Sequence, residues 1–331
     1  MIVPDPITSL LETALKARAG LLDSRREGTL RLFNGFYEGD PDLVVDIYGH
    51  TLVIFNHAER PSQGEAACQG ACEYLLAQFP WIQTVILKTR YDATLEYRHG
   101  RLIHGENPDH RVREYGVWYA IDLLMSQDAS LYLDTRLLRQ WAIQNLAGKT
   151  VLNTFAYTGS LGVAAQAGGA LRVVHSDLSR KCLNLAKTSY TLNGFPIHKA
   201  DFQVGDFWVH TSRMRRHGES FDCVFLDPPF FSMTPKGRVD QVEGSARLIN
   251  KVRPLVRQGG YLIAINNALF VSGAAYLDTL EALCADGYLT VEQLIPVPKD
   301  VTGFSQTIRR PPPVDTAPFN HSTKIAILRV K

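Results

Sequence analysis

The chain has 331 residues, of which 45% are hydrophobic and 21% charged, and this average composition excludes a mainly disordered, collagen-like or coiled-coil protein. Its length suits about two domains, and its longest mostly apolar stretch, residues 261–271, is too short for a bilayer, which needs about 20 residues. The net charge of +2 is unevenly placed: residues 1–117 carry 12 basic and 16 acidic side chains, whereas residues 118–331 carry 23 and 17. A moderately basic second part is compatible with a polyanionic partner.

The five cysteines are scattered along the chain and form no Cys-x-x-Cys pair. This pattern predicts no metal site, and reduced thiols are typical of the cytoplasm. We therefore expect a soluble cytoplasmic protein without a membrane segment. The sequence leaves the oligomeric state open, with a homodimer as one alternative.

The first 117 residues predict a helix and then a small α+β module. The helix is expected within residues 1–28, because Ser9 and Glu12 have the spacing of a capping box. Short apolar runs separated by turn residues then predict strands, a second helix and a hairpin turn at Arg98–Arg101. The expected strands are residues 30–33, 43–47, 52–55, 84–88 and 116–123, and the expected second helix is 64–78.

From residue 131 onwards, helical and strand patterns alternate with short connections. This alternation predicts an α/β fold with a mostly parallel sheet that is covered by helices on both faces. Ligands of such sheets bind at the carboxyl ends of the strands. The expected strands are residues 150–155, 172–177, 202–204, 221–227, 260–266, 290–295 and 324–330, and the expected helices are 132–146, 161–167, 179–193, 207–216, 241–255 and 274–287.

Three of these strands are followed by residues that suit a nucleoside. The loop Asn153–Gly162 opens a helix, and Gly159 permits a tight turn. The glycine spacing departs from the G-x-G-x-x-G of dinucleotide sites, which favours a ligand without phosphates. Asp177, after the second strand, can accept both ribose hydroxyls, and Asp206, after the third, can accept the amino group of adenine. Together they predict a site for S-adenosyl-L-methionine, an adenosine that bears a sulfonium.

The fourth strand ends in the most specific motif of the chain, Asp227-Pro228-Pro229-Phe230. Adjacent prolines fix φ and remove two donors, so the loop is expected to be rigid and extended. Asp227 and the proline carbonyls are then expected to face the methyl group that is transferred. Phe230 offers a flat face to a nucleobase, and such stacking is worth about 1–3 kcal/mol per base. The alternative interpretation is a rigid turn at a buried strand end.

These motifs resemble those of class I S-adenosylmethionine-dependent RNA methyltransferases, and in particular the bacterial 23S ribosomal RNA cytosine-C5 methyltransferase family. The matching segments are Gly39–Asp46, Tyr132–Arg136, Asn153–Gly159, Asp177 and Asp227–Phe230. The resemblance implies a Rossmann-like fold with a seven-stranded, mostly parallel sheet.

The resemblance further implies a small α+β module at residues 29–117, a candidate for substrate recognition, and a catalytic domain at residues 118–331. Asp134 and Arg136 are expected near the cofactor, where a guanidinium suits its methionine carboxylate. The further cofactor residues expected from the motifs are Asn153, Phe155, Tyr157, Thr158, Gly159, Asp177, Leu178, Asp206 and Asp227.

Substrate contacts are expected from Phe230 and Phe231, and from Arg309 and Arg310 in a late loop, because guanidinium groups bind phosphates. Two features depart from the family. Its members usually begin with an RNA-binding domain of the PUA type, whereas about 28 residues precede the first matched strand here. C5 methylation also needs a cysteine nucleophile, and the family's position after the fifth strand reads Ile265-Asn266-Asn267-Ala268. We therefore expect direct methyl transfer to a base of RNA, with ribosomal RNA as the first candidate.

Two other functions remain open. One is methylation of a small molecule or a protein, which a narrow, closed cleft would favour over a wide, basic one. The other is a non-catalytic RNA-binding module that retains the nucleoside pocket. Cofactor binding without methyl transfer to any RNA would favour this third function.

Overall fold

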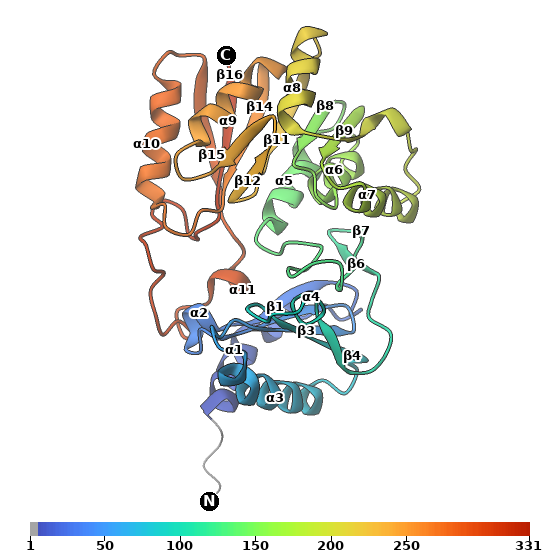
Figure 1. The fold of residues 1–331 in the computed structure, drawn as a ribbon, viewed down its shortest axis with the longest axis vertical. Helices are drawn as coiled ribbons and strands as arrows, with labels where there is room; N and C mark the ends of the chain where they lie inside the picture. Colours follow the sequence, from blue (N-terminus) through green and yellow to red (C-terminus); the bar gives the residue numbers. More distant parts are fainter. Residues whose placement is uncertain (1–5) are drawn as a thin grey trace, which may run out of the picture. The chain divides into compact units, whose positions relative to one another are not determined.

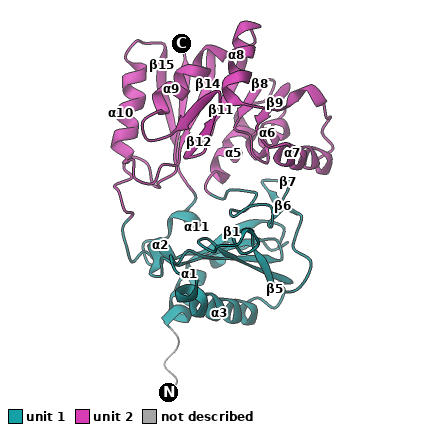
Figure 2. Cartoon of the chain, viewed as in Figure 1, with its two compact units in different colours: residues 1–133, 298–311 teal, residues 134–297, 312–331 magenta. Residues whose placement is uncertain are grey.

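The computed structural model describes residues 6–331, and the chain folds as two compact units (Figure 2). Unit 1 comprises Met1–Leu133 and Pro298–Pro311, and unit 2 comprises Asp134–Val297 and Pro312–Lys331. This division differs from the boundary expected after residue 117, and it assigns a late segment of the chain to unit 1. Residues 1–5 of the predicted N-terminal segment lie outside the described residues.

Unit 1 is built on a five-stranded sheet in the order β1-β2-β3-β4-β5, in which β3 and β4 are parallel and the other neighbours antiparallel. Helices α1 and α3 cover one face (Figure 1), because their apolar side chains, such as Leu11 and Leu75, pack on alternate strand residues such as Leu30 and Leu32. The elements are α1 (Pro6–Arg18), β1 (Thr29–Asn34), α2 (Gly35–Glu38), β2 (Leu43–Tyr48), β3 (Thr51–Asn56), α3 (Pro61–Gln78), β4 (Thr84–Thr89), α4 (Leu95–His99), β5 (Arg101–His104), β6 (Arg111–Glu114), β7 (Val117–Ala120) and α11 (Lys299–Thr302).

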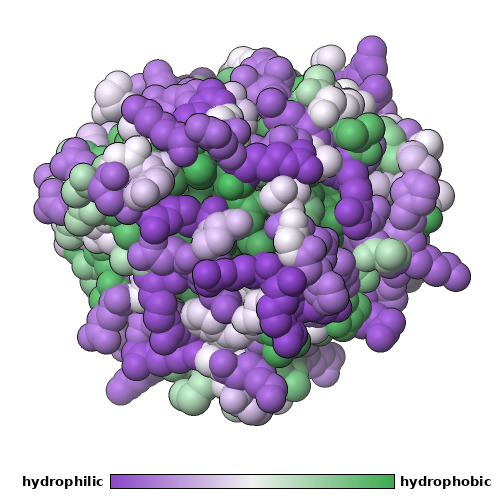
Figure 3. All heavy atoms as spheres, turned by 90° about the horizontal axis from the view of Figure 1, so that it is seen from above, coloured by the Kyte–Doolittle hydropathy of each residue, from purple (hydrophilic) through white to green (hydrophobic). Residues whose placement is uncertain are grey.

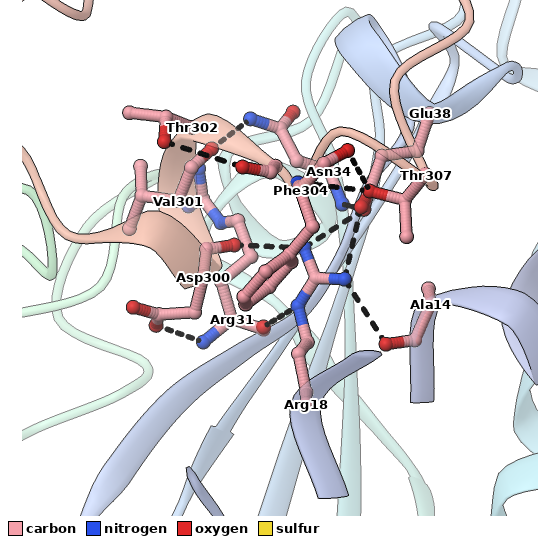
Figure 4. A network of polar contacts seen from close by, with 11 residues as sticks. Ala14, Arg18, Arg31, Asn34, Glu38, Asp300, Val301, Thr302, Phe304 and Thr307 are labelled. Carbon is pink, nitrogen blue, oxygen red and sulfur yellow. Dashed lines mark hydrogen bonds and ion pairs between the residues drawn. The ribbon is translucent and has the colours of Figure 1, made fainter. Parts of the chain in front are cut away.

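Residues 298–311 belong to unit 1, and the fully buried Arg18 at the end of α1 binds this late segment (Figure 4). Its guanidinium donates two hydrogen bonds of 2.9 Å to the buried carboxylate of Glu38. It also donates to the carbonyl oxygens of Ala14, Arg31 and Asp300 at 2.7 to 3.1 Å. All five guanidinium donors are thus used, and one of them holds the late segment.

Two more bonds hold the same segment to β1. The side chain of Asp300 accepts the backbone N–H of Arg31 at 3.0 Å, and the side chain of Asn34 donates to the carbonyl of Val301 at 2.6 Å. The Phe304 ring lies 5.2 Å from the guanidinium carbon of Arg18. These contacts join residues that are more than 260 positions apart in the chain, so local sequence patterns cannot reveal them.

Unit 2 contains the predicted seven-stranded sheet, with the order β10-β9-β8-β11-β14-β16-β15. All neighbours are parallel except β16, which is antiparallel to β14 and to β15, and the expected fold class is confirmed. The elements are α5 (Arg136–Asn145), β8 (Thr150–Thr154), α6 (Ser160–Ala167), β9 (Arg172–Asp177), α7 (Arg180–Leu192), β10 (Phe202–Val204), α8 (Phe207–Arg216), β11 (Phe221–Leu226), β12 (Phe231–Thr234), β13 (Gly237–Asp240), α9 (Ser245–Val252), β14 (Val256–Asn266), α10 (Gly273–Cys284), β15 (Leu289–Ile295) and β16 (Lys324–Val330).

Alternate residues of the central strands enter two separate cores. On β11, Val224 and Leu226 pack with side chains of α8, α9 and α10, whereas Cys223 and Phe225 pack with side chains of α5 and α6. Side chains of successive strand residues point to opposite faces of the sheet. Both faces are therefore covered, as the apolar run of residues 221–226 predicts.

Three local expectations are wrong. Residues 95–99 form the short helix α4, with Gly100 at φ 111° before β5, where a hairpin turn is expected. Helix α5 begins at Arg136 rather than at residue 132, and α9 spans Ser245–Val252 rather than residues 241–255. Elements also form where none is expected, among them the hairpin of β12 and β13 after the proline motif.

Within residues 6–331, no helix is long and apolar enough to cross a membrane. Figure 3 shows a face of the molecule on which hydrophilic side chains predominate, with hydrophobic ones visible between them. Most large apolar side chains are instead buried in the cores of the two units.

Candidate active site

The loop that follows β8 contains residues with positive φ angles, a backbone conformation that residues other than glycine rarely adopt. Phe155 and Tyr157 have φ values of 51° and 49°, and Gly159 has a φ of 79°. Non-glycine residues in such conformations cost about 1–3 kcal/mol each and cluster at functional sites. A Cβ on Gly159 would lie 2.5 Å from the Cβ of Ala186. Glycine is therefore required at this position, where α6 begins.

Asp177, at the end of β9, holds this loop in place. One carboxylate oxygen accepts the backbone N–H of Tyr157 at 2.8 Å, and the other accepts that of Ser179 at 2.7 Å. Burial raises the pKa of Asp177, although the two backbone donors oppose that shift. Each oxygen retains a second lone pair, so the carboxylate can still accept hydrogen bonds from a ligand.

A narrow hollow lies at the carboxyl ends of β8, β9 and β10, and four of the predicted cofactor residues line it. They are Phe155, Asp177, Leu178 and Asp206. Leu178 is exposed, and Phe155 stacks on Phe207 with 4.5 Å between the ring centroids. The structure thus brings together residues from three successive strand ends that are far apart in the sequence.

Asp206 has a structural task as well. One of its oxygens accepts the backbone N–H groups of Trp208 and Val209 and so caps α8, while the other accepts the hydroxyl of Thr234 at 2.6 Å. Thr234 belongs to β12, so the hairpin of β12 and β13 closes one side of the hollow. Trp208, which also lines the hollow, has a buried ring nitrogen without a hydrogen-bond partner in the described structure.

These groups fit the adenosine part of S-adenosylmethionine. Two carboxylates can accept hydrogen bonds from hydroxyl and amino groups, and an aromatic pair offers flat apolar surface to a purine. None of the described residues that line the hollow is a lysine or an arginine, which suits a nucleoside without phosphates.

Asp227 follows β11 and begins the proline loop. Burial raises its pKa to about 7, and the nearby carboxylate of Asp134 acts in the same direction. Asp134 itself accepts the hydroxyl of Thr323 at 2.7 Å. A carboxyl group with a pKa near neutrality can hold or release a proton at physiological pH, as general acids and bases require.

Gln241, which the sequence reasoning did not single out, clamps the proline loop. Its side-chain amide donates to the carbonyl of Pro228, and its backbone N–H donates to the carbonyl of Phe230 at 3.1 Å. Its side-chain oxygen accepts the backbone N–H of Asn267 at 2.5 Å. Asn266 donates in turn to the Gln241 carbonyl at 2.9 Å. The loop after β11 and the end of β14 are thereby fixed to each other.

The aromatic residues of the loop are open to solvent. Phe230 and Phe231 are each 49% exposed, and Pro229 is exposed as well. Large apolar rings with this exposure are available for stacking on a planar ligand. Phe231 begins β12, so its backbone is held by the hairpin while its ring remains accessible.

The other predicted cofactor residues occupy different positions. Asn153 is buried within β8, with its amide 3.5 Å from Nδ1 of His175, and Thr158 is buried in the loop after β8. Arg136 is half-buried as the first residue of α5. None of these three lines the hollow at the ends of β8, β9 and β10.

Arg309 and Arg310 belong to unit 1, whereas Phe230 belongs to unit 2. Both arginines are exposed, and both backbone N–H groups donate to the carbonyl of Tyr37, at 2.7 and 3.1 Å. The loop that carries them therefore packs on α2 of unit 1. The sequence pattern places them late in the chain and does not reveal this association.

The cysteines of the chain are not suited to nucleophilic attack at this site. Cys223 is fully buried within β11, and burial raises the pKa of its thiol. Cys68, Cys72 and Cys182 are buried, and Cys284 lies at the end of α10. The end of β14 carries asparagines and an alanine instead, with Asn266 and Ala268 buried.

Some lining residues that are absent from the predicted site nevertheless have a recognisable signal in the sequence. Phe207 and Trp208 directly follow Asp206, so aromatic rings at this strand end could have been expected. The segment Thr234-Pro235-Lys236-Gly237 has the composition of a tight turn, and the residues on either side of it alternate between apolar and polar. This combination is typical of a hairpin. Gln241 has no comparable signal, because its role depends on contacts between distant loops.

The S-adenosylmethionine-dependent methyltransferase family matches residues 45–301. The ribosomal RNA large subunit methyltransferase I of Aliivibrio fischeri is 31% identical over 79% of this chain and 66% of its own length. The enzyme of the same name from Photobacterium profundum is 29% identical over 77% of this chain and 67% of its own length. The chain therefore spans about two thirds of the length of these relatives.

Solved structures agree on the fold. The crystal structure of SMU.776 complexed with SAH superposes with a TM-score of 0.83 at 22% identity, over 100% of this chain and 83% of that one. This likeness extends over both units. With the sequence match over residues 45–301, it leads to one conclusion: the chain belongs to the S-adenosylmethionine-dependent methyltransferase family.

Proposed function

We propose that this chain transfers a methyl group from S-adenosylmethionine directly to a nitrogen atom of an RNA base, with ribosomal RNA as the substrate. The observation that carries the proposal is the loop after β11, where a carboxyl group with a pKa near 7 adjoins a clamped proline carbonyl and two exposed aromatic rings. The choice of substrate is supported by the relatives, which are named as ribosomal RNA methyltransferases.

The residues of the loop have distinct proposed roles. S-adenosylmethionine, when bound, supplies a methyl group on a positively charged sulfur that is prone to attack by a nucleophile. The nitrogen that receives the methyl group is an amino nitrogen, which donates one N–H to Asp227 and the other to the second lone pair of the Pro228 carbonyl, and both bonds orient it. Asp227 in its ionised form then takes up the proton that this nitrogen loses. Phe230 stacks on the base.

A covalent C5 mechanism has no support from the described residues. It requires a thiolate that attacks the ring, and the described cysteines are either buried with raised thiol pKa values or, in the case of Cys284, at the end of α10. RNA in which every cytosine is 5-fluorocytosine traps enzymes that use such a thiolate. We expect the purified chain to form no covalent complex with this RNA.

The proposal is tested by offering three classes of acceptor to the purified chain with methyl-labelled S-adenosylmethionine. We expect label in ribosomal RNA and not in a protein extract or a small-molecule extract. Label in protein or small molecules alone would overturn the choice of RNA. Tight cofactor binding without transfer to any acceptor would favour the non-catalytic RNA-binding module.

A separate prediction concerns Asp177, which we propose as the residue that binds the ribose hydroxyls. Asp177→Ala should weaken S-adenosylmethionine binding about 10- to 150-fold, because a hydrogen bond to a charged group contributes about 1.5–3 kcal/mol. Isothermal titration calorimetry measures the change. Asp177→Asn, which keeps one acceptor oxygen, should lose less affinity. Unchanged affinity in the alanine variant would show that the ribose binds elsewhere.

A further inference from the structure

Unit 1 contains its own cavity, on the sheet face opposite to α1 and α3. Its volume is about 170 Å³, and residues of β1, β2 and β3 line it together with residues 128–133. A cavity of about 150 Å³ is large enough for a benzene-sized ring. The cavity can therefore hold one flat heterocycle.

Aromatic side chains form much of the wall. Phe55 and His57 are stacked with an interplanar angle of 26°, and Phe36 meets the His57 ring edge-on with 5.0 Å between the centroids. Phe36 is 45% exposed and Tyr132 is 43% exposed, although both line the cavity. These two rings are thus accessible to a planar ligand that enters from solvent.

The polar groups of the cavity balance one another in charge. Arg31 forms a two-pronged ion pair with the buried Asp46, at 2.7 and 3.0 Å, and Asp128 pairs with Arg90 at 2.6 Å. Burial, with the guanidinium groups of Arg90 and Arg31, lowers the pKa of His57 to about 4, so this ring is neutral at pH 7. Such a lining offers hydrogen-bond donors and acceptors to an uncharged ligand, but no net charge to an anion.

Two exposed arginines belong to the loop that packs on α2. Phe36 is a residue of α2, and the carbonyl of the next residue, Tyr37, accepts the backbone N–H groups of Arg309 and Arg310. Both arginines are exposed. An electroneutral aromatic pocket suits the neutral planar base of a nucleotide, and exposed guanidinium groups elsewhere on the same unit suit its phosphates.

We propose that this cavity of unit 1 binds an unpaired base of the RNA substrate, with the base between Phe36 and Tyr132. The inference rests on the proposed function, because it assumes that RNA is the substrate. It adds a recognition site that does not include the Asp227 loop. Unpaired bases are the parts of RNA that proteins stack on aromatic side chains.

The test uses a 12-nucleotide single-stranded RNA with a fluorescent end label, titrated with the full chain in the absence of cofactor. Phe36→Ala and Tyr132→Ala should each weaken binding about 5- to 150-fold, the range expected for loss of one stacked base. Phe36→Tyr should bind like the unmodified chain, because it keeps a flat ring. Tyr91→Ala is the matched control, since Tyr91 is a 59% exposed aromatic residue of unit 1 outside the cavity lining.

A second measurement locates the base. The same RNA with 4-thiouridine is cross-linked by light, and the modified peptides are identified by mass spectrometry. Cross-links in the segments around Phe36 or Tyr132 are expected. If ribosomal RNA is methylated but the Phe36 and Tyr132 variants bind normally and cross-links map only to unit 2, the cavity proposal is overturned and the proposed function stands. If no RNA is bound or methylated, both fail.

Discussion

We expect Asp227→Ala to lower kcat/KM for methyl transfer to RNA about 10²- to 10⁴-fold, the range that proton transfer by a positioned side chain contributes. The variant removes both an acceptor for the substrate nitrogen and the group that takes up its proton. S-adenosylmethionine affinity should change far less, because the hollow at the ends of β8, β9 and β10 does not include this residue in its lining. Calorimetry with the cofactor separates the two effects.

The same residue predicts how activity depends on pH. Its pKa is raised to about 7 by burial and by Asp134, so the carboxyl group is protonated below neutrality and cannot accept a proton there. The value of kcat/KM should therefore fall about tenfold per pH unit below pH 7 and be constant above it. Asp227→Asn keeps an acceptor oxygen but cannot ionise, and it should lose this inflection.

Asp278→Ala provides the control for both experiments, because Asp278 is an exposed carboxylate of α10 in the same unit. It should leave the rate and the pH profile unchanged. Full activity in Asp227→Ala would remove this residue from the mechanism. An inflection near pH 7 that persists in Asp227→Asn would assign the titration to another group.

The second large effect concerns stability. Arg18→Ala should lower the free energy of unfolding of unit 1 by about 3–5 kcal/mol, as breaking one side of a buried ion pair generally does. The change leaves the buried Glu38 without its cation and removes the bonds to the carbonyls of Arg31 and Asp300 (Figure 4). The loss of unfolding free energy in unit 1 is measured by urea denaturation, with hydrogen exchange of peptides from α1, β1 and residues 298–311 as the probe.

Lys16→Ala is the matched control on the same helix. Lys16 also pairs with a glutamate, Glu12, but both side chains are exposed, so solvent screens the interaction. This variant should unfold like the unmodified chain. Equal stability of Arg18→Ala and Lys16→Ala would mean that the buried network does not hold the late segment in unit 1.

Much of unit 2 could be predicted from the sequence because its helices, strands and short loops follow from patterns of neighbouring residues. The apolar run before Asp227 and the short loops between helices and strands predict a parallel sheet, and parallel strands place their carboxyl ends at one edge. Asp177 and Asp206 could therefore be expected near each other. The structure places both on one hollow, together with Phe155 and Leu178.

The remainder depends on contacts between distant parts of the chain. Gln241 clamps the proline loop through bonds to Pro228 and Asn267, and none of these residues signals the others in sequence. The bond from Arg18 to the Asp300 carbonyl likewise spans 282 positions. Arg309 and Arg310 belong to unit 1 because the chain comes back to this unit at residues 298–311. No periodicity or turn pattern in the sequence predicts that.

The most direct test of the account is mass spectrometry of ribosomal RNA nucleosides from cells with and without the gene for this chain. We expect one methylated nucleoside to disappear when the gene is deleted, to return with the unmodified chain, and to stay absent with Asp227→Ala. The mass of the lost nucleoside would also identify the methylated base. Identical nucleoside content in the two strains would contradict the proposal that this methyltransferase acts on ribosomal RNA.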